Sequence, residues 1–371
     1  MRGAFLKKSE VHNPTKQPLV WLLLGDKLGD NAQVAQVMDH LHWDHEVRRL
    51  VFLEEYRLGK PDFRPALYHV DIERSDDLCE PWPDILITVG RRPDMVAQWI
   101  RQQSGGKTRI VLFGRPKKDL GDYALIIVPS QYQLPKADHI LPIKLPLMRV
   151  NQGRLAAGKK EWQERFGSMP HPITALLVGG PTKPFEMTTS STEELARQAL
   201  ELSEKSRGSL FISTSRRTPA KVVAAISAAV GEKAELHVFD PAQAENPYMG
   251  LLAWGDRFIV TGDSVSMMVE VASLGKPLAI HELPLKAGVL NHLGQAAAKL
   301  LYREGAPLRF VGNMLQRFGW VGFPRDLTAI HRQLYQCGAA TPLGRGFPED
   351  SAMIASEVAV VAERIRSLAA Q

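Results

Sequence analysis

Short apolar strands alternate with helical segments along most of this chain, and this alternation constrains the fold more than any other feature. Runs such as 84–89 (DILITV) and 173–178 (ITALLV) have the length and composition of buried strands. Each of them ends at a glycine, and helical patterns separate them from the next apolar run. Strands that alternate with helices predict parallel sheets covered by helices. We therefore expect an α/β fold.

The alternation of strands and helices runs twice along the 371 residues, with a break at 167–172 (GSMPHP). A chain of this length is enough for two domains of ordinary size. We predict a short N-terminal tail at 1–17, a first Rossmann-like domain at 18–166 and a second at 173–340, followed by an amphipathic helix within 349–371. Because such sheets bind ligands at the carboxyl ends of their strands, we expect two doubly wound domains in tandem that face a cleft.

Composition narrows the class of protein. No apolar run approaches the roughly 20 residues that span a bilayer, and the N-terminal residues lack the apolar core of a secretion signal. The two cysteines, Cys79 and Cys337, lie far apart and have no metal-binding spacing. We therefore expect a cytoplasmic protein that uses no metal and no other cofactor.

The chain carries a net charge of +6 and has a pI of about 9.2, which favours an anionic partner. Between residues 90 and 118, eight basic residues stand against one acid. No nucleic-acid motif accompanies them, so nucleic acid is not expected, whereas a membrane surface or a phosphorylated lipid fits the charge. The alternative is an ordinary solvated face. The residues that we assign to acceptor or membrane contact are Arg91, Arg92, Arg115, Lys117 and Lys118.

The segment 261–277 (TGDSVSMMVEVASLGKP) carries the most specific functional signal. It predicts a strand end, a tight turn and a helix that starts near Ser264. Ser264 and Ser266 lie at the helix N-terminus, where free N–H groups and the helix dipole favour an anion. Glu270 is a lone carboxylate on an otherwise apolar helix, four residues after Ser266, and it needs a partner if it is buried. A phosphate at the serines and a sugar hydroxyl pair at Glu270 would satisfy this face; alternatively, Ser264 only caps the helix and Glu270 faces water.

Three further turns of the second half add polar groups that suit a nucleotide: 179–183 (GGPTK), 213–219 (STSRRTP) and 246–248 (NPY). A lysine and two arginines in these turns are suited to a diphosphate, and the last turn is suited to shaping a base pocket. Because the turns follow successive strands, we expect them at one edge of the sheet, although surface arginines and purely structural turns are the alternative. The predicted donor-site residues are Gly180, Lys183, Ser215, Arg216, Arg217, Asn246, Tyr248, Ser264, Ser266 and Glu270.

The first glycine turn of the chain, 25–33 (GDKLGDNAQ), lacks the spacing of a dinucleotide fingerprint. Asp26 and Asp30 would repel a pyrophosphate, so the turn suits an acceptor that carries hydroxyl groups. Either carboxylate is a candidate general base. The alternative is that Asp30 is only an N-cap.

Six segments between about residues 20 and 282 carry a resemblance to a known family: GDKLGDNAQ, PDILITVGRRP, VGGPTKPF, STSRRTP, NPY and VTGDSVSMMVEVASLGKP. In this order they resemble the mitochondrial-fission ("elongated mitochondria") family and its bacterial relatives, which are described as glycosyltransferases. That family is similar to GT-B glycosyltransferases, including the lipid II-forming enzyme, in its Ser…Glu-x-x-x-x-Gly-x-Pro segment. The resemblance implies that Glu270 holds the donor ribose, that the start of its helix holds the diphosphate, and that the final helix crosses back to the first domain. Several GT-B enzymes carry a histidine base in the first glycine turn, where this chain has Asp30, so the identity of the base stays open.

These observations predict a metal-independent GT-B glycosyltransferase that uses a nucleotide sugar. The expected acceptor is an anionic envelope glycolipid, such as a lipopolysaccharide core, at the inner face of the inner membrane. Asp30 or Asp26 would deprotonate the acceptor hydroxyl, while Lys183, Arg216 and Arg217 would stabilise the leaving diphosphate. Two alternatives remain open: a nucleotide-sugar 2-epimerase of the same fold, and a non-catalytic adaptor that binds a partner at a membrane.

Overall fold

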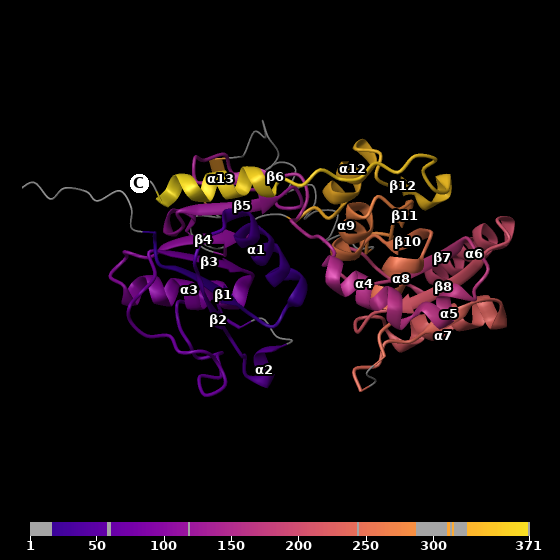
Figure 1. The fold of residues 1–371 in the computed structure, drawn as a ribbon, viewed down its shortest axis with the longest axis horizontal. Coiled ribbons are helices and arrows are strands. Elements are labelled where there is room, and N and C mark those ends of the chain that lie inside the picture. The colour runs from indigo at the N-terminus through magenta and orange to yellow at the C-terminus, as the bar shows by residue number, and fades with distance from the viewer. Residues whose placement is uncertain are drawn as a thin grey trace, which may run out of the picture.

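The protein consists of two α/β lobes that lie side by side (Figure 1). The computed structural model describes residues 17–57, 61–117, 119–242, 245–286, 310–311, 314 and 325–369. Lys118 and all of the expected N-terminal tail except Gln17 lie outside the described residues.

The first lobe is built on a parallel six-stranded sheet in the order β2-β1-β3-β4-β5-β6. Its strands are β1 (Val20–Leu24), β2 (Glu46–Arg49), β3 (Ile85–Val89), β4 (Arg109–Phe113), β5 (Leu125–Pro129) and β6 (Ile140–Ile143). Its helices are α1 (Leu28–Leu41), α2 (Glu54–Arg57), α3 (Arg91–Gln103) and the 3-10 turn η1 (Leu120–Asp122). The central strands β1, β3, β4 and β5 are largely apolar and buried because both faces of this sheet are covered, whereas the edge strand β2 is mostly charged and is not buried. On β3, Ile85, Ile87 and Val89 join one core, whereas Leu86 joins the core on the opposite face.

The second lobe repeats this design with the strand order β12-β11-β10-β7-β8-β9. Its strands are β7 (Ile173–Val178), β8 (Ser209–Thr214), β9 (Glu235–His237), β10 (Arg257–Thr261), β11 (Leu278–His281) and β12 (Thr341–Pro342). Its helices are α4 (Gln152–Glu161), α5 (Gln163–Gly167), α6 (Thr189–Lys205), α7 (Ala220–Val230), α8 (Tyr248–Trp254), α9 (Val265–Ser273) and α12 (Thr328–Gln336), with 3-10 turns η2 (Gly231–Lys233) and η3 (Leu343–Arg345). All described strand pairs in both sheets are parallel. The two sheets, their helix cover and the parallel pairing confirm the predicted doubly wound α/β architecture.

The chain first crosses between the lobes earlier than the sequence break at 167–172 indicated. Helices α4 and α5 belong to the second lobe, because Trp162 and Phe166 join its core beside Phe211. Helix α4 also packs tightly on α8: a Cβ added at Gly158 would lie 2.7 Å from the Cβ of Met249. The crossing segment therefore precedes α4. The glycine and prolines of 167–172 mark a turn inside the second lobe, whereas the real crossing, near 144–150, is apolar and packs against both cores.

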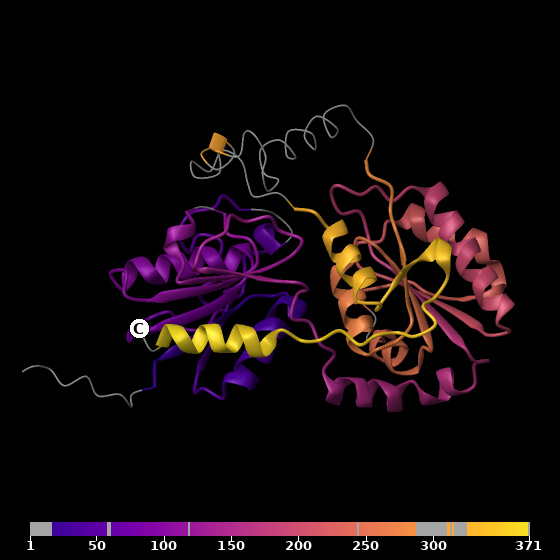
Figure 2. The same ribbon diagram turned by 90° about the horizontal axis from the view of Figure 1, so that it is seen from above.

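The chain crosses a second time after η3, and the terminal helix α13 (Val358–Ala369) returns to the first lobe (Figures 1 and 2). Its buried side chains, including Val361 and Ile365, complete the core beneath α1. Arg109 and Arg366 add hydrogen bonds to the carbonyls of Leu368 and His40 respectively. The return of the last helix is thus confirmed, but the helix begins at Val358, and the residues from 349 to 357 form the crossing instead.

Candidate functional site

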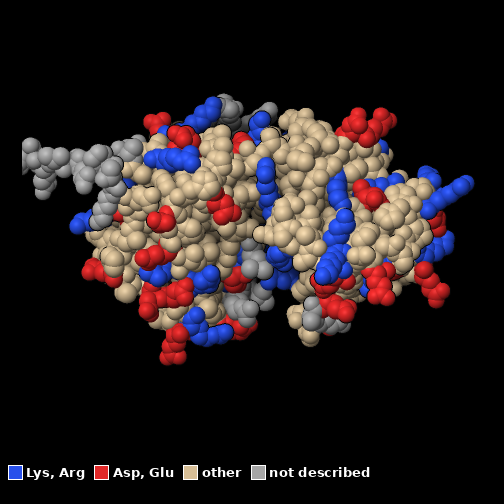
Figure 3. All heavy atoms as spheres, viewed as in Figure 1, with Lys and Arg blue, Asp and Glu red and all other residues tan. Residues whose placement is uncertain are grey.

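A cleft of about 810 Å³ lies between the two lobes, and residues from both sheets line it. The first lobe contributes the turns that follow β1, β3, β4 and β5, and the second lobe contributes the turns that follow β7, β8 and β10. These are the carboxyl ends of parallel strands, the edge at which α/β domains bind ligands. The space-filling view shows basic side chains along the seam between the lobes (Figure 3).

Positive charge dominates the cleft. Among the described residues that line it, seven are Lys or Arg and three are Asp. The basic residues are Lys27, Arg91, Arg115, Lys117, Arg216, Arg217 and Arg325, and the acids are Asp26, Asp30 and Asp263. Low-dielectric walls lined by one sign of charge focus the electrostatic field and concentrate ligands of the opposite charge. The cleft is therefore suited to an anionic ligand.

The N-terminus of α9 opens into this cleft. Ser264, Val265 and Ser266 all line it, and Ser264 is the N-cap residue although its side chain makes no capping hydrogen bond. The first N–H groups of a helix have no partner within the helix. The alternative in which Ser264 only caps α9 through its side chain is therefore excluded, and the N-terminal end of α9, which lines the cleft, suits an anion.

Asp263, which sequence reasoning treated only as part of a turn, organises the second-lobe wall of the cleft. Its side chain is fully buried, and its Oδ2 accepts hydrogen bonds from the Gly180 N–H at 2.9 Å and from Arg217 at 3.2 Å. Burial raises the pKa of the Asp263 carboxyl, while the bond from Gly180 and the Arg217 charge oppose this rise. The sequence signal for this role is weak: Asp263 is a carboxylate that stands directly before the helix N-cap and directly after a glycine.

The glycines of the turn after β7 are required by this packing. A Cβ added at Gly179 would lie 2.3 Å from Asp263 Oδ2, and one added at Gly180 would lie 2.3 Å from the backbone oxygen of Arg217. Distances of this kind are incompatible with a side chain. Gly180 therefore lets the turns after β7 and β8 meet, but it is not itself among the residues that line the cleft.

The two arginines of the turn after β8 have different surroundings. Arg217 forms hydrogen bonds to Thr182 and Asp263 and so is held in place across the β7 turn. Arg216 is exposed and lines the cleft. Both lie with Ser264 and Ser266 on the second-lobe side, so the structure brings four of the predicted donor-site residues together.

The remaining predicted donor-site residues lie at the border of this group or away from it. Ser215 is engaged with Thr218 within its own turn. Lys183 is exposed and is not among the residues that line the cleft. Asn246 accepts a hydrogen bond from the Tyr248 N–H at the start of α8. Lys183 is therefore a weaker candidate for diphosphate contact than Arg216 or Arg217.

Glu270 has the partner that its position in an apolar helix required, and that partner is Tyr248. The Tyr248 hydroxyl donates a hydrogen bond to Glu270 Oε2. Burial raises the pKa of Glu270, whereas this bond and the Arg154 charge oppose the rise. The pair joins α8 to α9, so two residues that the sequence singled out separately form one unit, but neither is among the residues that line the cleft.

On the first-lobe side, Asp30 and Asp26 both line the cleft but differ in how firmly they are paired. Asp26 accepts a hydrogen bond from the buried Arg92 at 2.6 Å. Asp30 has Lys27 at 3.8 Å, and burial raises the pKa of its carboxyl above the ordinary value. The helix cap of α1 is Lys27, so Asp30 is not the N-cap. A carboxylate with a raised pKa and a loose ion pair is better suited than Asp26 to accept a proton.

The basic residues between Gly90 and Lys117 do not form one outward face. Arg92 is only 7% exposed, contacts Asp26 and the Tyr56 carbonyl, and lies over the Phe52 ring, so it is a structural residue and not a membrane contact. Arg91, Arg115 and Lys117 line the cleft instead. The sequence run was misleading because Arg91 and Arg92, neighbours at the start of α3, have different surroundings.

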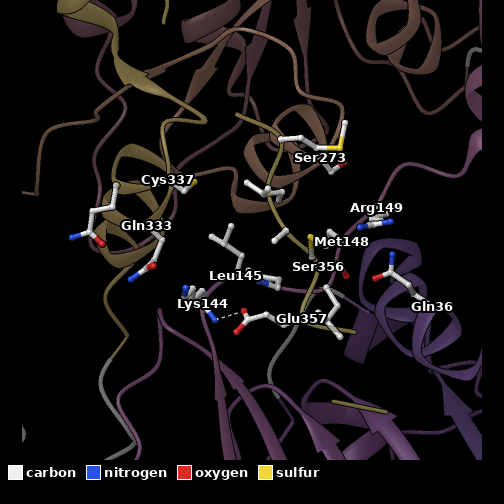
Figure 4. A pocket seen from close by; sticks show the side chains of 16 residues that line it. Gln36, Lys144, Leu145, Met148, Arg149, Ser273, Gln333, Cys337, Ser356 and Glu357 are labelled. Atoms are coloured by element: carbon white, nitrogen blue, oxygen red, sulfur yellow. Dashed lines mark hydrogen bonds between the residues drawn. The ribbon is translucent and has the colours of Figure 1, made fainter. Parts of the chain in front are cut away.

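A second cavity, of about 580 Å³, lies where the chain crosses between the lobes (Figure 4). Its lining comes from α1, the crossing near 144–149, α12 and the crossing before α13. The Lys144 N–H donates a hydrogen bond to Glu357 at 2.6 Å and thereby ties the two crossings together. This cavity shares Pro146 and Met148 with the cleft.

Within the described part of the chain, no three His, Cys, Asp or Glu side chains are grouped to hold a metal ion. No described helix is both long enough and apolar enough to cross a membrane.

Two Rossmann-like lobes around a cleft, with a last helix that returns to the first lobe, define the GT-B fold. Residues 28–316, more than half of the chain, match the family model "Mitochondrial fission ELM1", and the chain belongs to this family. It is 28% identical over 220 residues to the mitochondrial fission protein ELM1 of Arabidopsis thaliana, a match that covers 53% of this chain and 51% of that protein. The chain thus spans about half the length of this relative.

A second relative and a solved structure complete the comparison. An uncharacterised protein of Rickettsia prowazekii is 27% identical over 307 residues, which cover 71% of this chain and 83% of that protein. The solved UDP-GlcNAc 2-epimerase of Neisseria meningitidis is 11% identical, with a TM-score of 0.48 over 95% of this chain and 100% of that chain. Similarity at this level does not identify a substrate.

Proposed function

We propose that this protein is a glycosyltransferase that takes a nucleotide sugar as donor and an anionic cell-envelope glycolipid, such as a lipopolysaccharide core, as acceptor. One observation carries the proposal. The N-terminal end of α9, Arg216, Arg217 and the carboxylate of Asp30 all line a single cleft. The first group suits a leaving diphosphate, and the second suits an acceptor hydroxyl.

In the proposed reaction, the acceptor oxygen attacks the anomeric carbon of the sugar. The bond between that carbon and the diphosphate oxygen breaks, and the nucleoside diphosphate leaves with the bonding electrons. Asp30 takes the proton of the acceptor hydroxyl. Arg216, Arg217 and the N–H groups at the start of α9 stabilise the negative charge that develops on the diphosphate. The reaction as written needs no bound metal or other cofactor.

Contact with an anionic membrane is a further part of the proposal, because a glycolipid acceptor is held in a bilayer. Its support is the net charge of +6. The protein would then act as a peripheral protein at the inner face of the inner membrane.

The experiment that tests the proposal is a binding and turnover series with a panel of nucleotide sugars. Asp30→Asn preserves shape but removes the proton acceptor, so turnover should fall about 100-fold or more while nucleotide affinity stays near wild type. Asp26→Asn is the matched control, because this carboxylate is already engaged by Arg92. Normal turnover in Asp30→Asn would exclude it as the base.

Two other functions are separate outcomes of the same series. Conversion of the nucleotide sugar in the absence of any acceptor would identify a 2-epimerase. A folded protein that binds no nucleotide would identify a non-catalytic adaptor.

A further inference from the structure

Two arginines, Arg115 and Arg325, lie over the ring of one tyrosine that lines the cleft. A third, Arg91, donates a hydrogen bond to the Pro61 carbonyl and lies within electrostatic reach of Arg115. Arg91 follows β3, Arg115 follows β4, and Tyr132 lies in the turn after β5. The guanidinium carbon of Arg115 is 5.5 Å from the centre of the Tyr132 ring, and that of Arg325 is 5.7 Å from it. Arg325 comes from the segment that leads into α12 of the second lobe, so both lobes contribute to this cluster, which we call the Tyr132 cluster (Arg91, Arg115, Tyr132 and Arg325).

The backbone holds Arg325 in the cluster. Tyr132 and Arg325 form an isolated antiparallel bridge, and the Asp326 N–H donates a hydrogen bond to the Gln131 carbonyl at 2.8 Å. The neighbouring carboxylate is directed elsewhere: Asp326 accepts bonds from Thr328 at 2.6 Å and from Arg332 at 2.6 Å. The acid next to Arg325 in sequence is thus engaged with its own helix.

The charges of the cluster act on one another. Burial, followed by the nearby charges of Arg325 and Arg91, lowers the pKa of Arg115, while Tyr132 opposes this effect. Arginine nevertheless stays protonated at neutral pH, so the like charges of Arg115 and Arg325 are held close together over one ring, with the charge of Arg91 nearby. An anion bound between them would offset this repulsion, and guanidinium groups are the side chains best shaped to hold phosphoryl oxygens in pairs.

The Tyr132 cluster is separate from the anion site at α9 but close to the candidate base. The charge of Arg325 contributes to the pKa of Asp30, which places these two side chains within electrostatic reach of each other. Arg216, Arg217 and Ser264 come from other turns that line the same cleft. The cleft thus contains two groups of cationic or anion-favouring residues, and Asp30 lies within electrostatic reach of Arg325.

We propose that the Tyr132 cluster binds a phosphoryl group of the acceptor, so that the acceptor is a phosphorylated glycan whose hydroxyl is presented to Asp30. The assignment of the bound molecule as the acceptor rests on the proposed function, whereas the binding of a phosphoryl group at the cluster does not. Three cations favour a doubly charged phosphate monoester over a singly charged carboxylate. Because Arg325 belongs to the second lobe and Arg115 to the first, the subsite is complete only when both lobes contribute.

The test separates the two anion sites in one binding experiment. Inorganic phosphate is titrated by calorimetry into protein that is saturated with a nucleoside diphosphate. Phosphate should bind. Arg115→Gln or Arg325→Gln should weaken the affinity for phosphate about tenfold or more, because each removes a guanidinium group that can form paired, charge-assisted hydrogen bonds. Arg216→Gln is the matched control from the same cleft: it should weaken the nucleoside diphosphate and leave phosphate affinity near wild type.

Further arms define the ligand and its source. Arg325 is exposed, so its variants should fold, and their unfolding temperature is measured alongside. Malonate that binds as tightly as phosphate and depends on the same arginines would overturn the phosphoryl assignment. Glucose 6-phosphate and phosphatidylcholine vesicles that carry lipid A distinguish a soluble from a lipid-borne phosphate, and binding of either supports the subsite.

Unchanged phosphate affinity in both arginine variants would overturn the proposal, and so would an equal loss in Arg197→Gln, an exposed arginine of α6. If no nucleoside diphosphate binds, the proposed function fails, while the phosphate titration without nucleotide still tests the subsite.

Discussion

At the scale of single residues, buried carboxylates set the electrostatics of both lobes. Asp94, near the start of α3, is fully buried, and both of its oxygens accept hydrogen bonds from the Tyr123 hydroxyl, at 2.8 and 3.0 Å. Burial raises the pKa of Asp94 to about 7, and bonds from Tyr123 and Gln98 oppose this rise. The folded protein therefore binds a proton at Asp94 that the unfolded chain has already released.

This proton makes stability depend on pH. Because the folded pKa is higher than the unfolded one, the contribution of the neutral acid is fully present below about pH 4 and is lost as pH rises through 7. The substituted side chain of Asp94→Asn cannot ionise. The free energy of unfolding of this variant, relative to wild type, should therefore rise by up to a few kcal/mol as the pH is raised from 5 to 8. Urea denaturation at both pH values measures this. A difference that does not vary with pH would contradict the assignment.

The family resemblance assigns the donor ribose to Glu270, and this assignment can be tested by substitution. If it holds the donor ribose, it must exchange its bond from Tyr248 for bonds from the sugar. Glu270→Gln keeps an oxygen for Tyr248 but removes the charge, so nucleotide affinity should fall about tenfold or more. Tyr248→Phe retains the charge and should leave affinity equal or higher. Calorimetry with a nucleoside diphosphate decides, and unchanged affinity in Glu270→Gln excludes the ribose role.

At the scale of elements, the site depends on two turns that meet without side chains. The turn after β7 touches the turn after β8 at Gly180, where a Cβ would lie 2.3 Å from the Arg217 oxygen. Gly180→Ala should therefore displace the arginine turn and weaken nucleotide binding about tenfold or more, with a loss of about 1–3 kcal/mol in stability from overpacking. Gly29→Ala, in α1, has no atom within 4 Å of the new Cβ. It should leave nucleotide affinity unchanged and should not lower stability. Equal effects of both variants would argue against the turn contact.

Much of the fold and part of the site were predictable from sequence, for identifiable reasons. The strands are continuous apolar runs such as ITALLV, and parallel strands bring their carboxyl ends to one edge, which is why Asp30 and Ser264 face one cleft. The placement of α4 in the second lobe was not predictable, because an amphipathic helix does not specify which core it covers. Arg92 was wrongly predicted to be a surface contact, and the role of Asp263 was missed. Both are buried charged side chains, and such burial depends on partners that are distant in sequence.

At the scale of the whole molecule, the described residues join the two lobes through the crossings near 144–150 and 349–357, through the Tyr132–Arg325 bridge and through α13. The crossings meet where the Lys144 N–H donates a hydrogen bond to Glu357, and both residues line the cavity of Figure 4. Immediately afterwards, α13 covers the sheet of the first lobe, so a helix that follows the second lobe in sequence completes the core of the first. The stability of the first lobe therefore depends on residues at the other end of the chain.

Ile365 tests this dependence, because its side chain is fully buried between α13 and the first-lobe core. Ile365→Ala should lower the free energy of unfolding of the first lobe by about 2–5 kcal/mol, through lost transfer energy and a residual cavity. Hydrogen exchange should show lost protection in β1, β3 and α1, while β7 and β8 keep theirs, because those strands belong to a separate core. Val360 lies on the same helix but is 56% exposed, so Val360→Ala should change hydrogen-exchange protection in neither lobe. Equal loss in both lobes after Ile365→Ala would mean that the molecule unfolds as one unit, and the first lobe would then have no stability of its own for α13 to control.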